Sequence, residues 1–97
     1  MYQVLILAPG AKSANADIDF PSWAPKARAL CAVTVLSLTE GTPNTWTVSN
    51  KTIVTSGTPG TGEAILYDED TIHIGDAITT SDLVVVVYIP KGEYSGY

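Results

Sequence analysis

The sequence feature that most constrains the fold is an unbroken apolar run, residues 83–89, which reads LVVVVYI and ends at Pro90. Successive side chains of a strand point to opposite faces of a sheet, so a run without polar alternation predicts a strand covered on both faces. The run is far too short to cross a membrane as a helix. It therefore predicts an interior strand, covered by the protein's own core or by a second subunit.

A chain of 97 residues has room for one domain with one modest core. Thr, Val and Ile dominate after the first third, and turn residues gather at 40–44 and 56–62. Further strands are expected at 30–38, 46–48, 52–54, 63–67 and 70–74, the second and third of these as a hairpin or a bent pair. The pattern predicts an all-β fold, a single small antiparallel β-sandwich or barrel of jelly-roll or Ig-like type.

The first 28 residues do not follow this pattern. Residues 2–8 predict a short strand or apolar arm, but the segment after it is irregular and contains three prolines. We therefore divide the chain into an extended N-terminal arm (1–28), a β-sandwich core (29–90) and a flexible C-terminal tail (91–97). The arm is expected to contact another subunit through its apolar and basic side chains: Val4, Leu5, Ile6, Leu7, Phe20, Trp23, Lys26 and Arg28.

Charge is unevenly distributed along the chain. The net charge is −5, and residues 52–90 contain no Lys or Arg. Phosphate contacts need clustered basic residues, so this balance argues against nucleic acid as the main partner. Contacts between copies are compatible with it, with Lys12, Lys26 and Arg28 of one copy facing the acidic residues 68–70 of another. The N-terminal residues lack the basic start of a secretory signal, so folding in a cytoplasm is expected.

Few residues suggest chemistry. The single cysteine, Cys31, excludes an intrachain disulfide and is expected to be a small buried hydrophobe. The loop 57–62 lacks the Gly-Lys-Ser/Thr ending of a phosphate-binding loop. Asp68 and Asp70 are candidate Ca²⁺ ligands, but solvated turn carboxylates fit the pattern better than a metal site. His73 is expected at a surface or rim. We predict no catalytic residue, no cofactor and no membrane contact.

The aromatic residues leave one alternative open. Trp23 or Trp46, exposed on a flat face, could stack on a sugar as in small β-sandwich carbohydrate-binding modules. The other interpretation places Trp46 and Tyr88 in the core, and without a secretion signal we favour it.

Four segments, residues 32–43, 46–53, 71–77 and 84–88, resemble the β-rich structural proteins of tailed bacteriophage virions, namely capsid decoration and tail proteins. In those proteins a short strand of the type Thr-Ile-x-Phe/Ile precedes an Ala/Gly/Asp turn and an apolar strand that ends in Tyr. Here Ile74 beside His73 departs from the aromatic residue that is commoner there. The resemblance covers residues 30–90 and does not include the arm.

The resemblance implies a non-enzymatic structural subunit of a virus particle, made in the host cytoplasm. The role that fits best is a capsid decoration or cement protein that stabilises a shell lattice. Such a protein would associate with itself, as a trimer or another homo-oligomer, and would bind a major capsid protein or another virion protein. A phage tail or fibre component is an alternative within the same class, and the carbohydrate-binding module is the alternative outside it.

Overall fold

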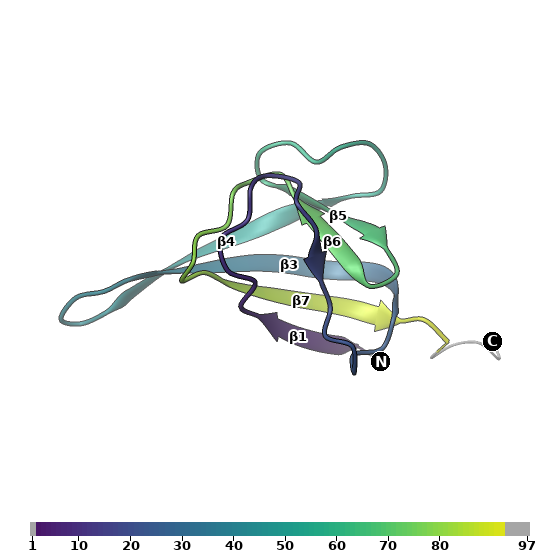
Figure 1. Cartoon of the computed structure of the whole chain (residues 1–97), viewed down its shortest axis with the longest axis horizontal. Coiled ribbons are helices and arrows are strands. Elements are labelled where there is room, and N and C mark those ends of the chain that lie inside the picture. The colour runs from purple at the N-terminus through teal and green to yellow at the C-terminus, as the bar shows by residue number, and fades with distance from the viewer. Residues whose placement is uncertain (1, 93–97) are drawn as a thin grey trace.

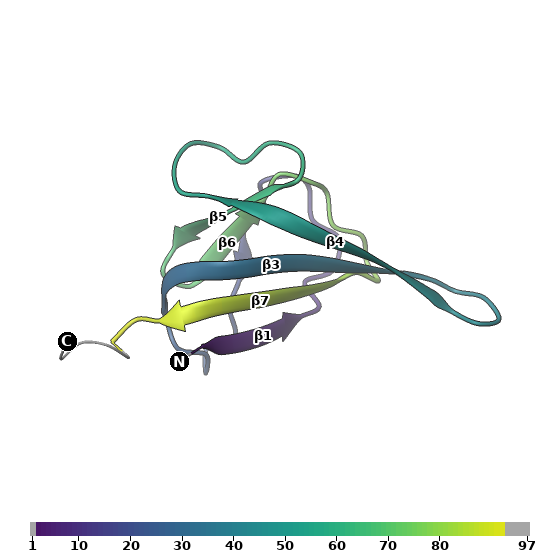
Figure 2. The ribbon, with the colours of Figure 1, turned by 180° about the vertical axis from the view of Figure 1, so that it is seen from behind.

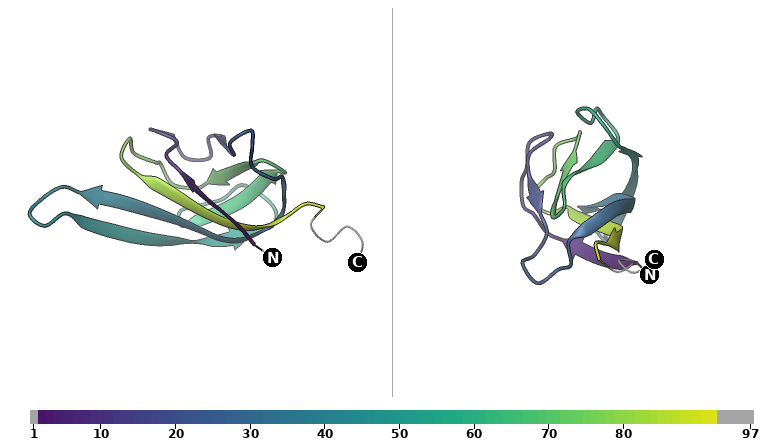
Figure 3. Two further views of the ribbon diagram at one scale, coloured as in Figure 1. Left: turned by 90° about the horizontal axis from the view of Figure 1, so that it is seen from below. Right: turned by 90° about the vertical axis from the view of Figure 1, so that its right-hand side faces the viewer.

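The computed structural model describes residues 2–92 and shows one curled β-sheet without a helix in those residues (Figure 1). The sheet order is β1-β7-β3-β4-β5-β6-β2. The end-on view in Figure 3 shows that the sheet curls into a half-barrel. The strands are β1 (Gln3–Leu7), β2 (Ile18–Asp19), β3 (Ala27–Thr39), β4 (Thr45–Val54), β5 (Glu63–Asp68), β6 (Thr71–Ile74) and β7 (Leu83–Pro90). The all-β prediction is confirmed, whereas a sandwich within one chain is not.

The apolar run that opens the sequence argument forms β7, and the prediction that it is an interior strand is confirmed. It pairs antiparallel with β1 on one side and with β3 on the other. Its burial alternates along the strand: Val84, Val86 and Tyr88 are fully buried, whereas the residues between them are only partly buried. The expectation that both faces are covered is therefore wrong within a single chain.

Strands β3 and β4 form a long hairpin whose tip projects beyond the body of the half-barrel (Figures 1 and 2). The expected turn at 40–44 connects them. The predicted break at 49–51 is absent, because Ser49, Asn50 and Lys51 continue the pairing of β4 with β3 in register. The sheet is also not purely antiparallel, since Thr52–Val54 of β4 pairs in parallel with Glu63–Ile65 of β5.

The expected extended arm is not confirmed, because its strands belong to the sheet. Strand β1 is an edge strand on β7, and β2 is the opposite edge, paired with β6. Alternation in β1 sends Leu5 and Leu7 into the core, and Ile18 and Phe20 join them from the other edge. At the C-terminal end, the Lys91 N–H donates to the Lys26 carbonyl at 2.7 Å. Residues 93–97 of the predicted tail lie outside the described residues.

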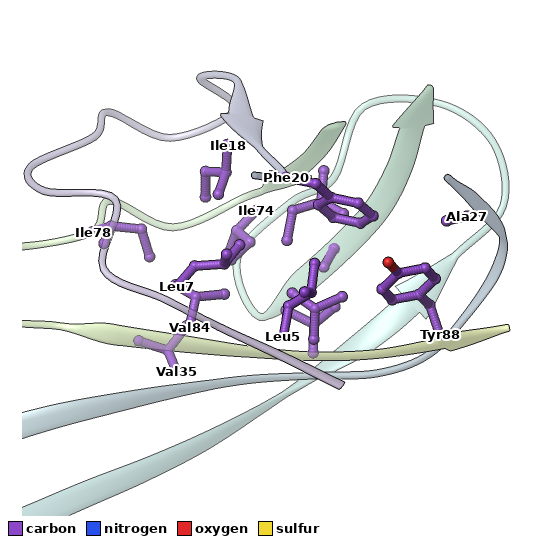
Figure 4. Close-up of a cluster of buried hydrophobic side chains, with 14 residues drawn as sticks. Leu5, Leu7, Ile18, Phe20, Ala27, Val35, Ile74, Ile78, Val84 and Tyr88 are labelled. Carbon is purple, nitrogen blue, oxygen red and sulfur yellow. The ribbon is translucent and has the colours of Figure 1, made fainter. Parts of the chain in front are cut away.

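The core fills the concave side of the half-barrel (Figure 4). Valines of β3 and β7 face Ile72 and Ile74 of β6 across this space. Tyr88 is fully buried and lies against Phe20, with ring centroids 4.9 Å apart. Its hydroxyl donates a hydrogen bond of 2.5 Å to the Pro25 carbonyl, so the one polar atom of this large side chain is satisfied. The prediction that Tyr88 is a core residue is confirmed.

The loop 55–62 does not close a hairpin. It connects the parallel strands β4 and β5, and Pro59 within it is buried. Gly75 of the segment after β6 packs so closely on this loop that a Cβ atom there would lie 1.9 Å from the Gly60 carbonyl oxygen. The Gly62 N–H donates to Asp76 at 2.8 Å. Backbone contact and hydrogen bonds therefore fix the loop against the body.

Candidate functional site

The most unusual surface of the protein is the convex side of strands β1, β7, β3 and β4. Strand registers align its outward side chains in rows across the sheet. The rows are Val4–Val87–Ala32, Ile6–Val85–Thr34–Asn50, Leu83–Leu36–Val48 and Leu38–Trp46. We call the ten apolar residues in these rows the apolar outer face.

Among the described residues, four of the ten residues of the apolar outer face are exposed and the other six are partly buried. Exposed fractions reach 52% for Val4 and 68% for Ile6 on β1, and 49% for Trp46 and 60% for Val48 on β4. Figure 2 looks onto these four strands, and no described segment crosses in front of them. The polar pair in the second row is satisfied internally, because the Thr34 hydroxyl donates to the Asn50 side-chain oxygen at 2.8 Å. A solvated sheet face normally alternates polar residues outward, so this one departs from the usual pattern.

The apolar outer face also lacks charge. No Asp, Glu, Lys or Arg occurs in residues 3–7, 29–39, 45–50 or 83–90. Those segments make up nearly all of β1, β7 and β3 and the first part of β4. The sheet edge formed by β1 likewise carries no Lys or Pro, the residues that most often prevent an edge strand from pairing with another chain.

The opposite side of the half-barrel carries ion pairs instead. Lys26 Nζ lies 3.4 Å from Glu69 and 3.3 Å from Asp70, and Lys91 Nζ lies 2.5 Å from Glu69. The Lys91 and Lys26 ammonium groups hold the pKa of Glu69 below its ordinary value. The contact between Lys26 and the acidic turn, expected between copies, is therefore made within one chain.

The acidic turn is organised by hydrogen bonds of its own. The Asp70 N–H donates to Asp68 Oδ1 at 3.0 Å, and this bond lowers the pKa of Asp68. In residues 2–92 no three His, Cys, Asp or Glu side chains are grouped as metal ligands. His73 Nε2 lies 2.7 Å from Asp17 Oδ1, and its ring stacks on Tyr67 at 3.9 Å between centroids. The first contact joins the segment before β2 to β6, and the stack joins β5 to β6.

Lys51 and Asp76 form the least exposed ion pair in the described part of the chain. Lys51 Nζ donates to Asp76 Oδ2 at 3.1 Å and to the Ser49 hydroxyl at 3.0 Å. The Gly62 N–H and the Lys51 ammonium lower the pKa of Asp76. The pair connects β4 with the segment after β6.

A cavity of about 210 Å³ lies between β3, β4 and β5. Arg28 and Leu30 of β3 line it, together with the end of β4 and Thr55 after it, and with Ile65 and Leu66 of β5. The cavity is open and small compared with typical ligand pockets. No acid, base or nucleophile converges on it from the lining side chains.

The eight predicted interface residues separate into different environments. Val4 and Ile6 lie on the apolar outer face, whereas Leu5, Leu7 and Phe20 are core residues. Lys26 is held in ion pairs, and Arg28 lines the small cavity. Trp23 is 73% exposed between β2 and β3. From the sequence, only the alternation of side chains along β1 could have predicted that Val4 and Ile6 face outward while Leu5 and Leu7 face the core.

Sequence reasoning missed several surface residues. Trp46 is exposed rather than in the core, because the β3–β4 hairpin extends past the body. Trp23 precedes β3 and Trp46 pairs near its far end, so roughly 35 Å of strand separates them and they cannot form one stacking platform. Cys31 is exposed, not buried, at a bulge where the pairing of β3 with β7 shifts between Leu30 and Ala32.

Comparisons with known proteins add no relative: no family model, curated protein or solved structure matches the chain. Residues 2–92 also contain no helix long and apolar enough to cross a membrane. A proposal for the function therefore depends on the surfaces of the chain itself.

Proposed function

We propose that this protein is a non-enzymatic structural subunit of a virus particle, a capsid decoration or cement protein that associates with itself and binds a shell lattice. The observation that carries the proposal is the apolar outer face, which continues onto the projecting β3–β4 hairpin. Exposed apolar patches larger than a few hundred Å² mark interaction surfaces in soluble proteins. The resemblance of residues 30–90 to virion proteins selects the particle as the setting.

The distribution of polar groups supports a scaffold rather than an active site. Three of the lysines pair with carboxylates near the loops, as in Lys26 with Asp70, Lys51 with Asp76 and Lys91 with Glu69. Trp46 pairs with Leu38, two residues past the Leu36–Leu83 pair at the start of β7, so it lies on the projecting hairpin and can reach a neighbouring protein while the core stays intact. Trp is among the residues that contribute most to binding energy at interfaces.

The test is the presence of the chain in particles. Particles released by cells that encode this protein are purified through a density gradient, and the chain is quantified against the major shell protein. The proposal predicts a fixed stoichiometry and retention after repeated washing. A folded Trp46→Ser variant, with an unchanged far-UV circular dichroism spectrum, should be lost from the particles. Absence of the wild-type chain from purified particles would contradict the proposal.

A carbohydrate-binding module is the second candidate, supported by the exposure of Trp23. With Trp46 at the other end of β3, this function would depend on a single stacking residue. Titration of a broad glycan panel against tryptophan fluorescence tests it, with Trp23→Ala as the control. No change across the panel would remove this candidate.

A further inference from the structure

We infer that the three rows of the apolar outer face that cross β7 are the contact between two copies of this chain, which pack sheet on sheet about a two-fold axis. The inference rests on the proposed assembly function and names the partner of one surface within it. The loop side and the row Leu38–Trp46, which lies on the projecting hairpin, are left to contacts outside the pair.

The first argument comes from β7 itself. Its inward residues Val84 and Val86 are fully buried by the chain's own core. Its outward residues Leu83, Val85 and Val87 are equally aliphatic but have no described segment over them. An antiparallel sheet that leaves one face in water alternates apolar with polar residues, and this strand does not. The composition of β7 therefore fits a strand with a second layer on its outer side.

Area is the second argument. At about 4.8 Å between strands and about 3.3 Å per residue, the full lengths of β1, β7, β3 and β4, hairpin included, outline roughly 600 Å². This outline is at the upper limit of the apolar patches that monomers usually expose. It is smaller than the ~800 Å² per partner of a standard interface, so the area fits a weak dimer.

Charge selects a second copy as the occupant. Two chains of net charge −5 repel each other unless they meet where charge is absent. In a two-fold contact each residue faces the same surface on the partner, so the surface must tolerate itself. The apolar outer face meets this condition because its four strand segments contain no charged residue. The loop side, with its carboxylates around residues 68–70, does not.

The packing would be that of two aligned sheets about 10 Å apart, with aliphatic rows interdigitating. Val85 and Val87 lie in the rows that cross β1, β7 and β3, so they would form the centre of the interface. The β-sandwich predicted from the sequence would then exist, with each copy supplying one sheet. This accounts for an apolar run that a single chain covers on one face only.

The test uses sedimentation equilibrium of the full-length protein. The wild-type chain is expected to be a dimer at micromolar concentrations. Ile6→Asp places a charge on a side chain that is 68% exposed, so the fold should survive while the dimer dissociation constant rises at least tenfold. Tyr67→Asp is the matched control, because Tyr67 is 60% exposed on β5 at the loop side. This variant should remain a dimer.

Salt dependence separates this contact from an ionic one. An apolar interface should keep or gain affinity between ~0.05 and ~1 M NaCl, because salt screens the repulsion between two acidic chains, whereas contacts between basic and acidic segments weaken as charges are screened. A monomeric wild-type chain, a trimer, or an Ile6→Asp protein that dimerises normally would each overturn the inference. A monomer that is still incorporated into particles would overturn it and leave the proposed function standing. A dimer that is absent from particles would support the inference and contradict the proposed function.

Discussion

The two sides of the half-barrel carry different kinds of outward side chain. On the loop side, formed by β5, β6 and β2, outward polar groups pair with one another, as in Lys26 with Asp70 and His73 with Asp17. On the apolar side, formed by β1, β7 and β3, the inward face is a dense core and the outward face is again aliphatic. On the loop side the outward polar groups have partners within the chain. The apolar side has the composition of a sheet that is covered by a second layer on its outer face.

The difference shows that one strand can serve two purposes. Along β7, alternate residues face the chain's own core and the apolar outer face, so neighbours in sequence belong to different contacts. Substitutions one residue apart should therefore have different consequences. The predictions below test this division, beginning with the largest expected effect.

A charge on the inner face of β7 should unfold the protein. Val86→Asp buries an unpaired carboxylate at a fully buried position, which costs more than about 4 kcal/mol, and a domain of this size has little more to lose. Val87→Asp, one residue further along, should keep the native far-UV spectrum while it impairs dimer formation. Circular dichroism with sedimentation checks both variants. A folded Val86→Asp protein would contradict the assignment of the inner face.

Gly75→Ala tests how tightly the loop side is packed. The new Cβ atom would lie 1.9 Å from the Gly60 carbonyl oxygen, so the loop 55–62 must move, at a cost of about 3 kcal/mol. Urea unfolding measures this loss. Gly60→Ala is the control, since a Cβ atom there has its nearest neighbour at 3.4 Å, and only a small effect is expected. Equal losses from both substitutions would show that the close contact is not the cause.

Removing the Asp76 charge should destabilise the loop side by about 2 kcal/mol, because Lys51 would keep its charge without a partner. The pKa of Asp76 is lowered in the folded protein by the Gly62 N–H and by Lys51. The stability that the Asp76 carboxylate contributes is therefore fully present above its ordinary pKa of about 4. It is lost as the pH falls through the lowered pKa of the folded protein. Asp76→Asn should flatten this acid limb of the unfolding free energy. An unchanged limb would contradict the role of Asp76.

The smallest effect is expected from the exposed ion pairs of the acidic turn. Lys26→Ala should lower the melting temperature by a few degrees at most, because both partners are largely in water. High salt should remove even this difference by screening the charges. Differential scanning calorimetry at two salt concentrations measures it. A large loss that persists in high salt would mean that the lysine stem contributes packing.

Periodicity and turn chemistry predicted much of the fold. The interior strand at 83–89, the turn at 40–44 and the core position of Tyr88 follow from local patterns. The parallel pairing of β4 with β5 and the place of β1 at the edge depend on long-range registers, which short patterns do not encode. The sequence predicts an arm at residues 1–28, which the structure does not confirm, because the contacts that hold this segment, such as Tyr88 with the Pro25 carbonyl, come from residues distant in sequence.

The apolar outer face was predicted only in outline. The lack of polar alternation in β7 indicated a second covering layer, yet it could not tell whether the chain supplies both layers. Successive side chains of a strand point to opposite faces, so residues 4–7 lie alternately on the surface and in the core. The predicted set of interface residues therefore includes both surface and core residues. The exposure of Trp46 was not predicted, because no local sequence pattern indicates that the β3–β4 hairpin extends beyond the body.

The most direct test of the central claim is the melting temperature of the unmodified full-length protein as a function of its concentration. If a second copy covers the apolar outer face, folding and association are linked, and the melting temperature should rise steadily across a hundredfold increase in concentration. A melting temperature that does not depend on concentration, in a protein that remains monomeric, would show that the face stays in water and would contradict the account.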